Sequence, residues 1–301
     1  MKTNFISIKK PKLSQAWLVL TNQMSYTLTQ EELIAKVEHC DSQVSALSLQ
    51  NFGLGYRQPK TIVALLEKIS SNIITLDLTN NVLSRLSIKE IDTLFQTLSK
   101  SSIKHLDLSL NAPRSIWSEE ELIAFFSKIS RNLESLCLGF YDLASYPANQ
   151  VKNAFKKLPA LQKLDLRNNC LANFKPDELT EILAAQSAPT LMLTTNGFGD
   201  SPDWSIAALL QCIPATTKCV NISRNCLASP DAETLKQLAE IKPELQEIII
   251  DSKRIYRADD NKAFIIQTVE KYHDAAFFQS KFAVPVQPVK NIEPVVVGLR
   301  A

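Results

Sequence analysis

The sequence predicts an α/β solenoid, a stack of repeated units in which a short strand is followed by a helix. One observation is the string LQKLDLRNNCL at Leu161–Leu171, because similar strings recur along most of the 301 residues. A second is that its leucines lie 3, 2 and 5 residues apart, a spacing that fits neither a helix nor an alternating strand. A third is that successive strings begin 27 to 30 residues apart, which leaves room for a helix in each unit.

Eight such strings follow one another, and a weaker one precedes them at Gln15–Ser25. The stretches between them carry apolar residues at helical spacing, and four begin near a proline, which is tolerated at a helix start. The strings begin at Val44, Ile73, Ile103, Leu133, Leu161, Ala188, Thr217 and Leu245. The expected helices cover Thr29–Cys40, Pro59–Ser70, Ser87–Lys100, Ser118–Ser130, Gln150–Leu158, Pro176–Gln186, Pro202–Cys212 and Pro230–Ile241.

We expect four parts along the chain. Residues 1–43 form an N-terminal capping unit, whose Thr29 and Glu32 are spaced as a capping box. Residues 44–257 hold the repeat array. The stretch AFIIQTVEKYHDAAFF within residues 258–279 predicts a helix that caps the open end of the core. Residues 280–301 alternate prolines with valines, which predicts an extended or disordered tail; the alternative is a short recognition or secretion signal.

An asparagine stands two residues before the last apolar position in most of the strings. We expect its side-chain amide to bond backbone groups in the turn after each strand, so that the asparagines form a ladder. Three strings depart from this pattern, with Phe52, Tyr141 and Lys253 at the asparagine position. Only Tyr141 lies in the middle of the array. The ladder asparagines are Asn81, Asn111, Asn169, Asn196 and Asn225.

Over roughly Gln15 to Phe278, these units resemble leucine-rich repeats of the ribonuclease-inhibitor type. The resemblance implies a horseshoe-shaped arc of about eight to nine repeats, with parallel strands on the concave face and helices on the convex face. It implies a scaffold that binds a protein partner. The chain is also similar in style to the leucine-rich effectors that intracellular bacteria such as Legionella inject into host cells, which implies a host protein as the partner.

Composition argues against several other classes of protein. The 33 basic and 31 acidic residues give a net charge of about +2, and the basic residues are spread out, so nucleic-acid binding is not expected. No apolar run is long enough to cross a membrane, and the N-terminus lacks a signal peptide's apolar region. The six cysteines form no CxxC pair, which favours free thiols in a reducing compartment. We therefore expect a cytoplasmic monomer, or a protein delivered into a host cytosol without a signal peptide.

The candidate partner-binding residues lie in and beside the middle strands. Side chains that alternate with the paired leucines point to the concave face, and aromatic and arginine side chains nearby are typical of interface hot spots. Two alternatives stay open: the aspartates are common fillers of the L-D-L pattern, and Phe140 and Tyr141 pack into the core. The candidates are His105, Asp107, Arg114, Cys137, Phe140, Tyr141, Lys163, Asp165 and Arg167.

We expect no enzyme activity, no cofactor and no metal site. An open sheet offers Cys137 no oxyanion donors, the three histidines are far apart in the repeat order, and no nucleotide-binding glycine motif occurs. One alternative function is regulation of a small GTPase, because some arrays of the ribonuclease-inhibitor type act on GTPases; Arg114 or Arg167 would then assist hydrolysis. Another alternative is a cysteine-dependent enzyme that uses Cys137. Cys170 and Cys226, which stand between Asn and Leu in equivalent turns, are expected to be small buried core residues.

Overall fold

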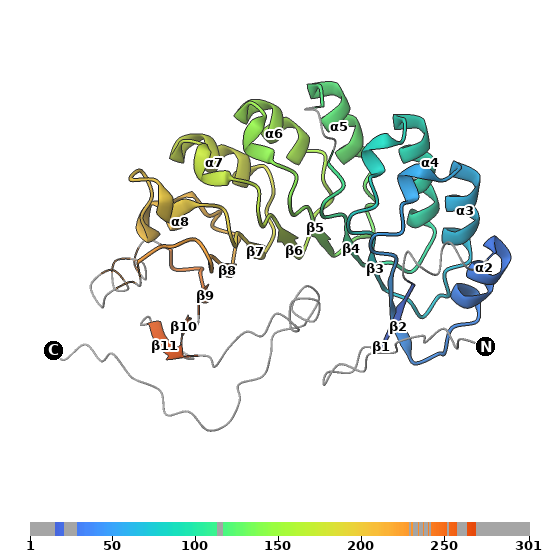
Figure 1. Ribbon diagram of the computed structural model, residues 1–301. Helices are drawn as coiled ribbons and strands as arrows, with labels where there is room; N and C mark the ends of the chain where they lie inside the picture. The colour runs from blue at the N-terminus through green and yellow to red at the C-terminus, as the bar shows by residue number, and fades with distance from the viewer. Residues whose placement is uncertain are drawn as a thin grey trace. The chain divides into compact units, whose positions relative to one another are not determined.

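The computed structural model describes residues 16–20, 29–112, 117–228, 230, 234, 237, 240, 242–251, 253–257 and 264–268 (Figure 1). The chain divides into two compact units. The first contains Met1–Tyr141 and Lys157–Ala160, and the second contains Asp142–Lys156 and Leu161–Ala301. Each unit is built from the strand and helix pairs that the leucine pattern predicts.

Unit 1 is a parallel sheet with helices packed along one of its faces (Figure 1). Each strand pairs in parallel with the next, and the first leucines of the paired motifs, such as Leu76 and Leu106, lie opposite each other. Short 3₁₀ turns connect strands to helices. The elements are β1 (Ala16–Val19), α2 (Gln30–Glu38), β2 (Val44–Ser48), η1 (Leu54–Tyr56), α3 (Pro59–Glu67), β3 (Thr75–Asp77), η2 (Leu83–Arg85), α4 (Ile88–Ser99), β4 (His105–Asp107), α5 (Glu119–Lys128) and β5 (Ser135–Cys137).

Unit 2 continues the same alternation and ends in an antiparallel hairpin. Strands β6 to β9 pair in parallel, whereas β10 pairs antiparallel with both β9 and β11. The elements are η3 (Leu143–Ser145), α6 (Ala148–Phe155), β6 (Lys163–Asp165), η4 (Leu171–Asn173), α7 (Pro176–Ala184), β7 (Thr190–Met192), η5 (Phe198–Asp200), α8 (Ile206–Cys212), β8 (Cys219–Asn221), β9 (Glu247–Ile250), β10 (Lys253–Arg257) and β11 (Phe264–Thr268).

The predicted α/β leucine-rich repeat solenoid is confirmed. Its core forms because the motif leucines of each strand point to the same side as the apolar stripe of the following helix. In unit 1, Leu76, Leu78 and Leu83 of the third strand and its turn are buried, and Phe125 and Phe126 of helix α5 are fully buried. Each repeat covers its apolar face only by stacking on the neighbouring repeats.

Helix starts follow local chemistry. The capping box predicted at Thr29 and Glu32 is present, with the Glu32 amide donating to the Thr29 hydroxyl and the Thr29 amide donating to the Glu32 carboxylate. Reciprocal bonds of the same kind begin α4 and α5. Helices α3 and α7 instead begin with a proline, whose fixed φ suits the first helical turn.

The prediction of a C-terminal helix within residues 258–279 is wrong at Phe264–Thr268, because these residues form strand β11. The apolar residues Phe264, Ile265 and Ile266 fit a strand as well as a helix, because a short run of this kind has no unambiguous period. Strand β9 presents a free edge, and β10 and β11 continue the backbone pairing from it. The other residues of the predicted helix and the tail 280–301 lie outside the described residues.

The asparagine side chains bond the turn backbone inside each unit. Asn111 donates from Nδ2 to the carbonyls of Leu78 and Leu108 at 2.8 Å each, and its Oδ1 accepts from the amide of Asn81 at 2.9 Å. The side chain of Asn111 is completely buried, so these bonds replace water for backbone groups that have no strand partner. The same pattern of buried amides occurs at Asn81, Asn169, Asn196 and Asn225.

None of the described helices is both long and apolar enough to cross a membrane.

Candidate functional site

Each strand from β2 to β9 ends in a turn with left-handed backbone. In unit 1 the first such turn residues are Asn51, Asn80, Leu110 and Phe140, all with φ between 54° and 62°. Asparagine adopts this conformation at low cost, whereas leucine and phenylalanine rarely do. Leu110 and Phe140 follow neighbouring strands, and the Leu110 amide donates to the carbonyl of Gly139 at 3.0 Å. Both side chains are about two-fifths exposed, at 41% and 42%.

Tyr141 faces the opposite way from its neighbour Phe140 and is only 2% exposed. Its hydroxyl donates to the carbonyl of Leu108 at 3.1 Å, and its ring lies 6.3 Å from the ring of Phe125. Leu108 is the strand residue whose carbonyl also accepts from the Asn111 amide. Tyr141 therefore fills the ladder position with a hydroxyl and packs in the core, so its prediction as a partner-contacting residue is wrong.

The aspartates on the helix-free face of the sheet are also buried. Asp77 and Asp107 are 0% exposed and oppose each other in the register of β3 and β4. The Oδ1 of each accepts from the amide two residues further on, Thr79 and Ser109, at 2.9 Å. These amides would otherwise lack an acceptor in a dry environment, so the aspartates have a structural role. The prediction that the Asp107 side chain contacts a partner is therefore wrong.

Cys137 is buried opposite Asp107 and contacts the Ser109 hydroxyl, with 3.0 Å between Sγ and Oγ. A buried thiol bonded to a neighbouring hydroxyl cannot be reached by a substrate or a partner, so the prediction of Cys137 as a contact residue is also wrong. His105 at the start of the same pair of strands is half-buried. Arg114 lies outside the described residues.

The three remaining candidates lie together on β6 and its turn in unit 2. Lys163 is half-buried, whereas Asp165 and Arg167 are buried and bonded to each other. Arg167 Nε donates to Asp165 Oδ1 at 2.9 Å, a second bond joins Nη2 to Oδ2, and the Arg167 amide also donates to Oδ1 at 3.1 Å. The guanidinium is thus held by a carboxylate in a two-pronged pair, and the expectation that Arg167 contacts a partner is wrong.

Cys170 and Cys226 are exposed, so the prediction that they are small core residues is wrong. Both occupy the second left-handed position of the turn, with φ of 54° and 55°, and this backbone directs the side chain away from the core. Partial burial and the nearby Asp142 carboxylate raise the pKa of the Cys170 thiol, which keeps it protonated and weakly nucleophilic near neutral pH.

The described residues contain no group of three or more His, Cys, Asp or Glu side chains that could hold a metal ion. The hollow between α2, η1 and α3 has a cavity volume of about 10 Å³, and a second hollow, lined by Ile213 and Leu245, has one of about 100 Å³. Both volumes lie below the roughly 300–1,000 Å³ of small-molecule sites. Neither hollow is therefore an active-site cleft.

Sequence reasoning missed Leu110, which the structure places beside Phe140. The available signal was positional: Asn51 and Asn80 hold the equivalent position in the preceding repeats, whereas these two neighbouring repeats carry large apolar residues there. Leu110 and the predicted Phe140, together called the apolar turn pair below, are exposed large apolar residues at neighbouring turns of unit 1.

No family model and no curated protein matches the chain. Among solved structures, the chain is similar to the leucine-rich repeat-containing protein LegL7 from Legionella pneumophila, with 29% identity and a TM-score of 0.68. That match covers 78% of this chain and 73% of LegL7. A second structure, the TLR13–ssRNA13 complex, matches at 19% identity and a TM-score of 0.45 over 78% of this chain and 32% of the other, which supports no inference about function.

Proposed function

We propose that this leucine-rich repeat protein is a non-enzymatic protein-interaction module that holds its partner at the apolar turn pair of unit 1. The likeness to a Legionella pneumophila protein supports a bacterial origin for such a module and a host protein as its partner. On this proposal the protein acts in the cytosol of the host cell, as a rigid surface rather than as a catalyst.

The observation that carries the proposal is the conformation and exposure of Leu110 and Phe140. A non-glycine residue with a left-handed backbone costs about 1–2 kcal/mol, and asparagine is the residue that reduces this cost. Leaving about two-fifths of a large apolar side chain in water forgoes burial energy as well. The left-handed backbone belongs to the repeat turn itself, since Val82, Thr195 and Arg224 share it. The two neighbouring turns differ in exposing a large apolar side chain, which partner contact explains.

The pair has the make-up of an interface centre. Phe140 provides an aromatic ring, and the backbone bond from Leu110 to Gly139 holds the two turns side by side. Aromatic side chains at the centre of an interface contribute a large part of the binding energy, while polar neighbours exclude water. The buried residues on the helix-free face, such as Asp107, support the strands beneath.

The test replaces both apolar residues by the asparagine found at the equivalent positions of the preceding repeats, giving Leu110→Asn/Phe140→Asn. The matched control is Ile74→Asn, because Ile74 is also an exposed apolar residue of unit 1, at 39%. Wild type, double variant and control are used to capture proteins from host lysate, and the partner found is titrated by calorimetry.

We expect the double variant to bind the purified partner at least about tenfold more weakly, which corresponds to ~1.4 kcal/mol. The control should bind within about twofold of wild type. Equal binding by all three proteins, with circular dichroism unchanged, would remove the apolar turn pair from the interface.

The GTPase-regulator alternative has less support. Arg167 cannot reach a bound nucleotide from its buried pair with Asp165. Arg167→Ala is therefore expected to leave unchanged any acceleration of GTP hydrolysis measured across a panel of small GTPases.

A further inference from the structure

A second exposed surface in unit 1 lies at η1 and η2 and combines arginines with aromatic rings. The Arg85 guanidinium carbon lies 4.6 Å from the ring centre of Tyr56, and that of Arg57 lies 4.8 Å from the ring centre of Phe52. Tyr56 is 65% exposed, the highest value among the exposed large apolar residues that the structure describes. Stacking on an aromatic ring fixes the plane of a guanidinium and leaves its N–H groups free to point outward.

This surface carries positive charge without local neutralisation. The segments Gln50–Lys60 and Thr79–Lys89 contain four basic residues and no acidic residue. Within the described chain, no ion pair joins Arg57 or Arg85 to a carboxylate. The four basic residues are Arg57, Lys60, Arg85 and Lys89.

The acidic residues at the neighbouring helix starts are mostly engaged. Glu32 and Glu90 each accept the amide that begins their own helix, at 2.7 Å. Glu31 is exposed in the first turn of α2. Helix α3, by contrast, begins without a side-chain cap or an acidic residue in its first turn, so its amide dipoles add to the positive potential.

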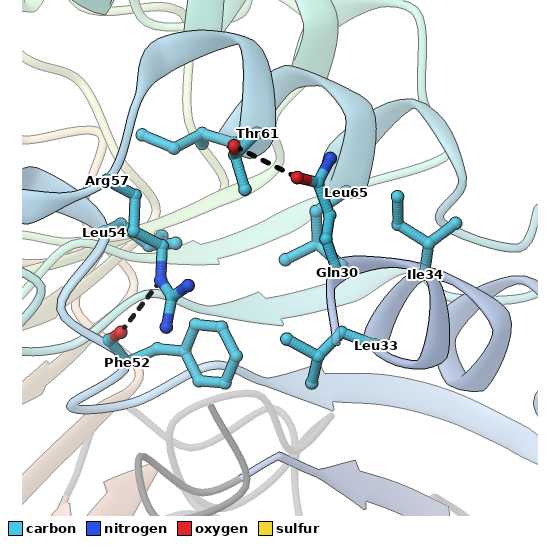
Figure 2. Close-up of a pocket in the computed structure, with 9 residues that line it drawn as sticks. Gln30, Leu33, Ile34, Phe52, Leu54, Arg57, Thr61 and Leu65 are labelled. Carbon is cyan, nitrogen blue, oxygen red and sulfur yellow. Dashed lines mark hydrogen bonds between the residues drawn. The ribbon is translucent and has the colours of Figure 1, made fainter. Parts of the chain in front are cut away.

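Beside Arg57 lies the hollow between α2 and α3, which Figure 2 shows in close-up. Its apolar lining includes Leu33, Phe52 and Leu65, and its rim includes Arg57 and the hydrogen bond of 3.3 Å from the Thr61 hydroxyl to Gln30. Figure 2 shows the Arg57 side chain extending beside the Phe52 ring at the edge of this hollow, where its Nε donates to the Phe52 carbonyl at 3.5 Å.

Arg57 differs from its counterparts in three other repeats. It follows η1 directly, whereas the residues that follow η2, η3 and η4 are Leu86, Tyr146 and Phe174, all buried. In the first repeat a half-buried arginine therefore stands where these three repeats have a buried apolar side chain.

We propose that this surface binds an acidic segment of a protein partner, with aspartate or glutamate side chains on Arg57 and Arg85 and one apolar side chain on the exposed Tyr56 ring. The proposal rests on the proposed function and names the chemistry of its partner. Guanidinium groups match carboxylates in a two-pronged geometry, which favours this partner. The net charge of about +2 and the small number of clustered basic residues disfavour a nucleic acid, which leaves an acidic peptide as the occupant.

The test measures fluorescence anisotropy of a fluorescein-labelled peptide in which glutamates flank a central leucine, titrated with the full-length protein. One control peptide has glutamine in place of every glutamate, and another has serine in place of the leucine. Single-stranded RNA and phosphatidylserine vesicles are tested beside them. The variant Arg57→Gln/Arg85→Gln is compared with Lys100→Gln/Arg131→Gln, which removes the same charge from two exposed residues elsewhere in unit 1.

We expect the glutamate peptide to bind with a Kd below about 1 mM. The Arg57→Gln/Arg85→Gln protein should bind it at least about fivefold more weakly, and the matched control should stay within about twofold. Both control peptides should also bind more weakly than the glutamate peptide. Binding should weaken as salt rises from about 0.05 to 0.5 M, because exposed charges are screened over that range.

Absence of peptide binding, or an equal loss in both charge variants, would overturn the inference, as would stronger Arg57- and Arg85-dependent binding of RNA or vesicles. These results leave the proposed function separately testable, because the apolar turn pair is probed with other variants and another partner assay. Partner capture that depends on Phe140 but not on Arg57 and Arg85 would sustain the function and refute the acidic segment.

Discussion

Replacement of Tyr141 separates the contribution of its ring from that of its hydroxyl. Tyr141→Phe removes only the hydrogen bond of 3.1 Å to the Leu108 carbonyl. That carbonyl still accepts from the Asn111 amide at 2.8 Å, so no buried polar group becomes unsatisfied. The expected loss in the free energy of unfolding is therefore only about 0.5–1.5 kcal/mol.

Tyr141→Ala also deletes a ring that is 2% exposed and lies against Phe125. Removal of a buried aromatic side chain leaves a cavity and costs about 3–5 kcal/mol. Phe140→Ala is the matched control one residue away: its ring is about three-fifths buried, so the expected loss is about 1–2 kcal/mol.

The assay is urea unfolding of the full-length chain, followed by far-ultraviolet circular dichroism. The midpoint should fall in the order wild type, Tyr141→Phe, Phe140→Ala, Tyr141→Ala, with an unchanged dependence on urea. A loss below about 1 kcal/mol for Tyr141→Ala would refute the core position of the ring. Equal losses for Tyr141→Phe and Tyr141→Ala would assign the whole contribution to the hydroxyl.

Three further predictions concern polar groups. Asn111→Ala should lower the free energy of unfolding by about 2–5 kcal/mol, because the Asn81 amide loses its buried acceptor; a midpoint equal to wild type in urea would contradict this. Arg167→Met should cost about 3–5 kcal/mol by leaving Asp165 buried and unpaired, and Asp165→Leu/Arg167→Met should cost less; a double-mutant cycle checks the sign. Hydrogen bonds from the backbone and side chain of Ser87 lower the pKa of Glu90, so this carboxylate stabilises the fold above its unfolded pKa and loses that effect as the pH falls through its folded pKa. Ser87→Ala should flatten the decline of the melting temperature between about pH 5 and pH 3 in calorimetry, and parallel curves for the two proteins would refute it.

Much of the fold could be predicted because repeat proteins encode structure locally. The spacing of the leucines identified every strand from β2 to β9, and the spacing of Thr29 and Glu32 identified a capping box. Each repeat contacts only the repeats beside it. The short string of one repeat is therefore enough to predict its strand and its turn.

The candidate site could be predicted only in part. Alternation along a strand predicted that the side chains of Asp107 and Cys137 point to the helix-free face of the sheet. It did not predict whether these side chains are exposed to solvent on that face. Parallel strands lie about 4.8 Å apart, so short side chains on neighbouring strands cover one another. Asp107 accepts from the Ser109 amide of its own repeat, whereas Cys137 contacts the Ser109 hydroxyl of the preceding repeat, a contact that no single repeat contains.

The final strands show the same limit in another form. Phe264–Thr268 has apolar residues compatible with a helix or a strand, and pairing with the open edge of β10 selected the strand. A strand there receives backbone partners from β10, whereas a helix would leave the edge of β10 unpaired.

By itself, the sequence determined the repeat, its strands and helices, and the positions of the ladder asparagines, because the string from Leu161 to Leu171 and its copies repeat at fixed spacing. Only the tertiary structure decided which of two adjacent aromatic residues is available to a partner. Phe140 and Tyr141 are adjacent and have similar side chains. The left-handed backbone at Phe140 turns its ring outward and directs Tyr141 to the carbonyl of Leu108 in the preceding repeat. Exposure depends on contacts between repeats, and those contacts exist only after the chain has stacked.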